Sequence, residues 1–217
     1  MLKIYTAIVT VASLLSVGAV SANSVNNDIS YLQKEWAIIN YKTAEDEREN
    51  AFSVLAEKAK EIVGKYPNHA EPLVWEGIIL STYAGAKGGL GALGLIEEAR
   101  DRLLDAEKIN PNALNGSIYT SLGSLYYQAP GWPISFGSND DAKLYLNRAL
   151  ELNPNGIDPN YFYGDFLIEQ ERYKEAVAVL KHALEAPIRQ KRPVADAGRK
   201  ADINKKIVFA KKKINQQ

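Results

Sequence analysis

The sequence predicts an all-α protein in which antiparallel helical hairpins stack into a solenoid and a last helix caps the stack. The clearest evidence lies in residues 157–187, where apolar residues recur three and four positions apart on both sides of a polar break at 169–172. Three small residues stand where the two helices would come closest: Gly164, Ala176 and Ala183. Because one hairpin cannot bury its apolar face alone, we expect it to be one unit of a stack.

A repeated helix ending supports this prediction. Similar breaks, each with Pro followed by Asn, occur at 65–68, 109–112 and 152–155. The helices before the last two breaks share one rhythm of small and large residues: Ala99, Leu103 and Ala106, then Ala142, Leu146 and Ala149. The helix preceding each second helix carries a glycine: Gly77, Gly123 and Gly164. These regularities indicate units of common geometry.

The apolar pattern predicts the order of the helices. They are expected over 28–41, 44–63, from 70, 95–109, around 119–126, 140–152 and on both sides of the 169–172 break, with an amphipathic tail at 189–213. Gly64 is expected to end the second of these helices, just before a proline. Thr43 and Asp46 are expected to cap its start through side-chain hydrogen bonds.

The motif Tyr119-x-x-Leu122-Gly123-x-x-Tyr126, followed by the alanine and leucine rhythm and Pro154, resembles the tetratricopeptide repeat (TPR). The resemblance covers roughly residues 44–187, and the first two units are lengthened inside their hairpin loops. It implies a TPR-like α-solenoid whose first helices line a concave face that binds a protein or peptide partner.

If the first helices line a concave groove as in TPR proteins, ten residues would face it: Glu71, Val74, Ile78, Ser117, Thr120, Ser124, Tyr127, Asp158, Tyr161 and Asp165. Their mixture of apolar, hydroxyl and acidic groups favours an extended or helical segment carrying basic residues. The candidate partner-binding residues among them are Tyr127, Asp158, Tyr161 and Asp165, and a binding groove requires Tyr161 and Asp165 to be open to solvent. A merely solvated inner face is the alternative.

The longer hairpin loops are the other candidate sites. Residues 84–94 contain G-x-G-x-x-G at Gly89, Gly91 and Gly94, but a dinucleotide site needs a preceding strand, and here a helix is predicted. We therefore expect a turned loop and no cofactor. Residues 128–137 carry Trp132 and Phe136 in a stretch stiffened by two prolines, and these aromatic residues either pack on the protein itself or bind a partner or an apolar small ligand.

The first 22 residues are typical of an export signal, with Lys3 before an uncharged apolar run at 8–20 and small residues ahead of a cut after Ala22. A short membrane anchor is the alternative. The sequence thus predicts three parts: a signal peptide at 1–22, repeats at 23–187 and a basic cap at 188–217. The mature protein would be periplasmic, and without any cysteine it would depend on packing alone.

Charge is divided unevenly along the chain. Residues 188–217 hold ten Lys and Arg against two Asp, whereas residues 23–187 hold 15 basic and 24 acidic residues. The basic tail is expected to be a capping helix with a polar outer face, and peripheral contact with an anionic membrane is the alternative. We expect no nucleic-acid partner for the acidic body.

The sequence offers no catalytic constellation or metal site. Its two histidines, His69 and His182, stand in no spacing that pairs them with a nucleophile or a metal. We therefore expect an exported interaction module rather than an enzyme. The alternative function comes from a distant similarity, in the leader, the lengthened repeats and the inserted loops, to the T component of tripartite (TRAP-type) transporters, which would imply a periplasmic small-molecule binder.

Overall fold

The computed structural model describes residues 15–216, so the first part of the predicted signal peptide, residues 1–14, lies outside the described residues, as does residue 217. The described chain forms nine α-helices and no named strand, which confirms the all-α fold class. The helices are α1 (Leu15–Lys42), α2 (Glu45–Lys65), α3 (Ala70–Lys87), α4 (Leu93–Ile109), α5 (Ser117–Gln128), α6 (Asn139–Leu152), α7 (Ile157–Glu169), α8 (Tyr173–Leu184) and α9 (Pro193–Ile214). Short 3₁₀ helices, η1 (Leu90–Ala92) and η2 (Ala113–Gly116), precede α4 and α5.

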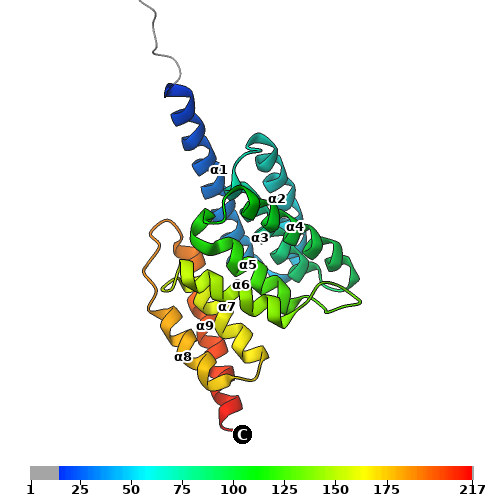
Figure 1. The fold of residues 1–217 in the computed structure, drawn as a ribbon, viewed down its shortest axis with the longest axis vertical. Helices are drawn as coiled ribbons and strands as arrows, with labels where there is room; N and C mark the ends of the chain where they lie inside the picture. The colour runs from blue at the N-terminus through cyan, green and yellow to red at the C-terminus, as the bar shows by residue number, and fades with distance from the viewer. Residues whose placement is uncertain (1–14, 217) are drawn as a thin grey trace, which may run out of the picture.

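The helices pack in sequence order as a stack of hairpins (Figure 1). The pairs α3/α4, α5/α6 and α7/α8 are the three units expected from the repeated residues, and α1 and α2 precede them as a further hairpin. Of the first helices, α5 contacts both α3 and α7, and the three form the inner layer of the stack. This layered arrangement is the one the TPR resemblance implies.

One glycine in each unit allows the two helices to approach closely. A Cβ atom at Gly77, Gly123 or Gly164 would lie 2.8, 2.6 or 2.6 Å from the Cγ atom of Leu103, Leu146 or Leu180, respectively. Each of these leucines is fully buried. The glycine and leucine positions are therefore complementary halves of one repeated helix contact, which explains their spacing in the sequence.

The last helix caps the stack, and it also reaches the first helix. Ile203, Ile207 and Ala210 are buried, as the predicted stripe requires. Besides α8, α9 packs against α1. There the Tyr41 hydroxyl donates to the Asp202 carboxylate at 3.2 Å, and Gly198 leaves room for the Tyr41 ring. The sequence did not predict this contact between the two ends of the stack.

Several local predictions differ from the structure. The predicted Thr43 cap is wrong, because Ala44 is the N-cap of α2 and has no side-chain cap, while the Thr43 hydroxyl donates to the Ile38 carbonyl at 3.4 Å. Gly64 does not end α2, which continues to Lys65. Apart from its two chain neighbours and the backbone of its own helix, nothing lies within 4 Å of a Cβ placed there, so Gly64 faces open space.

The glycine-rich segment begins later than predicted, because α3 continues to Lys87. Gly88 and Gly89 then adopt φ values of 65° and 58°, in the left-handed region that glycine tolerates, and η1 follows. A helix precedes these glycines, so the prediction of a turned loop is confirmed. Within residues 15–216, no helix is long and apolar enough to cross a membrane.

Candidate binding cleft

The inner layer borders an open cleft with a volume of about 940 Å³. Its walls come from α1, α2, α3, α5, the start of α7 and the segment that leads into α9. One polar stripe of α5 lines it through Ser117, Ser121, Ser124 and Gln128. These residues share a face because their spacing matches successive helical turns.

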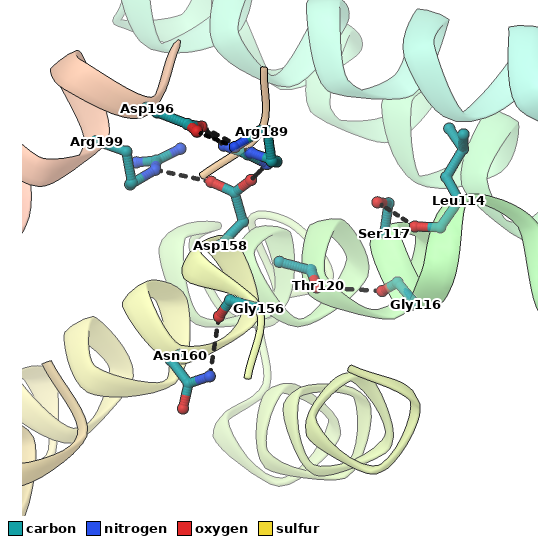
Figure 2. Close-up of polar contacts among 10 residues, drawn as sticks. All are labelled: Leu114, Gly116, Ser117, Thr120, Gly156, Asp158, Asn160, Arg189, Asp196 and Arg199. Atoms are coloured by element: carbon teal, nitrogen blue, oxygen red, sulfur yellow. Dashed lines mark hydrogen bonds and ion pairs between the residues drawn. The ribbon is translucent and has the colours of Figure 1, made fainter. Parts of the chain in front are cut away.

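Hydroxyl groups stabilise the backbone at the start of this stripe. The Ser117 hydroxyl donates to the Leu114 carbonyl at 2.7 Å, and the Thr120 hydroxyl donates to the Gly116 carbonyl at 3.1 Å (Figure 2). Leu114 and Asn115, both of which line the cleft, have φ values of 50° and 51°. Left-handed backbone is unusual for residues other than glycine and is often found at binding sites.

Two tryptophans from different helices form an aromatic floor. The Trp36 and Trp75 rings meet edge to face with centroids 6.2 Å apart, and both line the cleft. The Trp36 indole N–H donates to the Thr82 hydroxyl at 2.9 Å. Trp75 is only 3% exposed, and its indole Nε1 has no hydrogen-bond partner among the described residues.

Arginines form a further wall of the cleft, around Asp158 at the start of α7. The Asp158 carboxylate accepts hydrogen bonds from Arg189 Nη1 at 2.7 Å and from Arg199 Nε at 2.9 Å (Figure 2). Burial alone would raise the pKa of Asp158, but the Arg199 and Arg189 guanidinium groups hold this pKa well below its usual range. Arg189 also binds Asp196, so one network joins α7, the connecting segment and α9.

The turn before α7 positions Asp158. The buried Asn160 side-chain amide donates to the carbonyls of Pro154 at 2.7 Å and of Gly156 at 2.9 Å (Figure 2 shows the second bond). These bonds stabilise the turn that directly precedes Asp158. The Gly156 carbonyl also accepts the backbone N–H of Asn160 at 3.4 Å, so the side-chain bond adds to the first backbone bond of α7.

Further along α7, the cap covers the residues that were expected to be open. Tyr161 and Asp165 are each only 8% exposed, so the expectation of solvent access is wrong. Lys206 pairs with Asp165 at 2.5 Å, and the Arg199 guanidinium lies 4.2 Å from the centroid of the Tyr161 ring. The basic tail of the same chain therefore occupies the acidic surface that the sequence assigned to a basic partner.

Tyr127 joins this covered group. Its hydroxyl donates to Asp165 at 2.9 Å, and burial, together with the Asp165 charge, raises the pKa of Tyr127. Tyr127, Tyr161 and Asp165 do not line the cleft, whereas Asp158 does. Any role of these three residues in partner binding stays a prediction.

The two aromatic residues of the 128–137 loop differ in their surroundings. Trp132 is 90% exposed. Phe136 is partly buried, with its ring 5.2 Å from the Tyr126 ring and the Arg100 guanidinium 4.5 Å above it. Phe136 thus packs on the stack, and neither residue lines the cleft.

This difference leads to a prediction on stability. Trp132→Ser should change the free energy of unfolding by less than about 0.5 kcal/mol, because an exposed side chain loses little contact. Phe136→Ala should lower the free energy of unfolding by about 1–2 kcal/mol through lost apolar burial. Urea unfolding followed by circular dichroism measures both, and equal losses for the two variants would contradict the assignment.

Sequence reasoning missed the residues that give the cleft its character: Trp36, Trp75, Arg48 and Arg192. Trp36 lies in the helix predicted over 28–41, and it is only 7% exposed. Trp75 stands one helical turn after Glu71, a position already assigned to the inner face, and this spacing could have identified it. Arg192 lies in the connecting segment, which no periodic pattern describes.

The histidines lie outside the cleft. His69 Nδ1 is 3.9 Å from Glu71 and His182 Nδ1 is 3.6 Å from Glu185, and the side chains of both histidines are more than 40% exposed. Across the described residues, no group of three or more His, Cys, Asp or Glu side chains could hold a metal ion.

Residues 134–187, from the second hairpin loop through α8, match the tetratricopeptide repeat family. The whole arrangement is similar to the crystal structure of a thermophilic TPR protein from Thermus thermophilus, with a TM-score of 0.56 and 17% identity over 89% of this chain and 96% of that one. The fold is a TPR-like α-solenoid.

Among curated proteins, none matches this chain significantly. The TPR match spans the third hairpin and the second helix of the hairpin before it, where the repeat residues are clear. TPR-like solenoids are typical of protein-interaction scaffolds, because stacked hairpins create extended concave surfaces. The similarity to TRAP-type T components is not shown and stays a prediction.

Proposed function

We propose that this protein is an interaction scaffold that binds an extended segment of a partner protein in the concave cleft. The cleft itself carries the proposal, because a TPR-like stack here leaves about 940 Å³ open along its inner helices. Hydroxyl and amide groups of α5 offer hydrogen bonds to a peptide backbone, and the tryptophan floor offers apolar contact.

The rigidity of the walls supports binding. The α5 stripe rests on a helix packed closely through Gly123, and the Asp158 network holds the arginine wall. A preformed site loses less conformational entropy on binding than one that must order itself. Neither Trp132 nor Phe136 borders the cleft, so the loop expected to hold an apolar small ligand does not contribute to this site.

We further propose that the scaffold acts after export, with residues 1–22 removed. A cut after Ala22 would fall inside α1, ahead of Val25 and Ile29, whose buried side chains hold this helix on the stack. Membrane contact of the cap stays a prediction, and Arg189, Arg199 and Lys206 of this region already bind carboxylates within the protein. That the protein has no enzymatic activity also stays a prediction from the sequence.

Site-specific crosslinking tests the proposed cleft. A photoreactive amino acid at Ser121, in the cleft, should crosslink a partner from an extract of the source cells, whereas the same group at the exposed Asn147 on α6 should not. Ser121→Trp, which fills the cleft, should reduce capture of that partner by about tenfold or more, and Asn147→Trp should leave it unchanged. Identical crosslinked proteins from both positions would contradict the proposal.

A further inference from the structure

Positive charge predominates around the cleft, although the body of the chain is acidic. The charged residues that line it are Arg48, Arg189, Arg192, Arg199, Glu45 and Asp158. Asp158 is shared by two of these arginines, and Asp196 is bound by Arg189. The carboxylates nearest to the arginine wall are therefore already engaged within the protein.

Arg192 differs from the other arginines of that wall. Its guanidinium lies over the Trp75 ring, 5.3 Å from the ring centroid, and makes no hydrogen bond or ion pair within the described part of the chain. Its Nε atom is buried without a partner, and so is Trp75 Nε1. Burial lowers the pKa of Arg192, and the nearby Asp158 charge acts against this shift.

Both unpartnered groups are donors only, so what they lack is an acceptor. Buried polar groups in native proteins nearly always have a partner, and those that do not call for a specific explanation. A carboxylate provides two acceptor oxygens and the opposite charge, and it forms strong bonds with a guanidinium group. The stacking of Arg192 on Trp75 places the two donors on neighbouring side chains at one wall of the cleft.

We propose that the partner segment is acidic and that Arg192, stacked on Trp75, binds one of its carboxylate side chains. This inference rests on the proposed function. It reverses the basic segment expected from the sequence. The reversal follows from the cap, which neutralises Asp158 and Asp165 with its own basic side chains and leaves Arg192 unpaired.

Tryptophan fluorescence can test this with defined peptides. The probes are an acetylated and amidated hexapeptide of alternating glutamate and alanine, and its versions with glutamine or lysine in place of glutamate. In the full chain carrying Trp132→Phe, the signal comes from Trp36 and Trp75, because the sequence has three tryptophans. The glutamate peptide should change this signal saturably and bind about tenfold or more tightly than either of the other two.

A matched pair of variants tests the role of Arg192. Arg192→Met should weaken the glutamate peptide about tenfold or more, whereas Arg148→Met, on the exposed surface of α6, should leave its affinity unchanged. Circular dichroism verifies that each variant is folded, and Trp75→Phe, which removes the indole donor, should weaken binding to a smaller extent. If Arg192→Met does not fold, the comparison of peptides still tests the inference.

The outcomes separate the two proposals. Tighter binding of the lysine or glutamine peptide overturns the acidic inference and leaves the interaction scaffold intact, as does unchanged glutamate binding in Arg192→Met. Absence of any response to all three peptides also overturns the acidic inference. Crosslinking from Ser121 then decides the proposed function by itself.

Discussion

Replacing Asp158 with asparagine is expected to lower the free energy of unfolding by about 3 kcal/mol, because removing the carboxylate of a buried ion pair leaves the arginine charges incompletely compensated. The change keeps the shape of the side chain but leaves Arg189 and Arg199 without their shared carboxylate. The Arg199 side chain is only 10% exposed and its other carboxylate, Asp202, lies 3.7 Å away, so neither water nor Asp202 replaces the short bond to Asp158. Urea unfolding at neutral pH, followed by circular dichroism, measures the loss.

A surface ion pair is the matched control. Asp105 and Lys108 lie three residues apart on α4, and both of their side chains are largely exposed. Asp105→Asn should therefore leave the unfolding midpoint within experimental error. Equal losses from the two substitutions would show that the Asp158 network contributes no more than an ordinary surface pair.

The same network predicts a pH dependence. Since the pKa of Asp158 is lowered in the folded protein, its charge stabilises the fold fully above the unfolded value of about 4. As the pH falls below that value, the unfolded chain takes up a proton first and the stabilisation is progressively lost. The difference in stability between the wild type and Asp158→Asn should shrink below about pH 4, and a constant difference from about pH 7 to about pH 3 would contradict this.

The residues of α7 show what the sequence could and could not predict. Helical spacing placed Asp158, Tyr161 and Asp165 correctly on one face of one helix. It could not show that α9 returns across this face, because that contact joins residues about 40 positions apart through side chains with no periodic pattern. The sequence predicted that these residues share a helix face, but it did not predict that Arg199 and Lys206 of α9 cover Tyr161 and Asp165.

The cleft, too, could be predicted only in part from the sequence. Ser117, Thr120 and Ser124 were predicted on the inner face of α5, and all three line the cleft. The tryptophan floor depends instead on α1 packing against α3, and the arginine wall depends on the segment between α8 and α9. Local periodicity describes a helix face, whereas a cleft is defined by elements that are distant in the chain.

A single methyl group added at Gly123 is expected to destabilise the protein, although alanine favours a helix over glycine by about 1 kcal/mol. The new Cβ would lie 2.6 Å from Leu146 Cγ and 3.1 Å from the Leu146 backbone nitrogen. The leucine is fully buried, so α5 and α6 would have to separate. We expect Gly123→Ala to lower the free energy of unfolding by about 1–3 kcal/mol, as overpacking of a core does.

At a helical glycine that faces open space, we expect substitution by alanine to raise the free energy of unfolding instead of lowering it. Gly64→Ala in α2 would place its Cβ more than 4 Å from the side chains of every residue except its two chain neighbours, so helix propensity alone should stabilise the protein by about 0.5–1 kcal/mol. Urea unfolding of both variants under one condition gives the two signs directly. Stabilisation by both substitutions would mean that α5 and α6 can separate at little cost, and that the repeated spacing of glycine and leucine within this chain does not determine how its hairpins close.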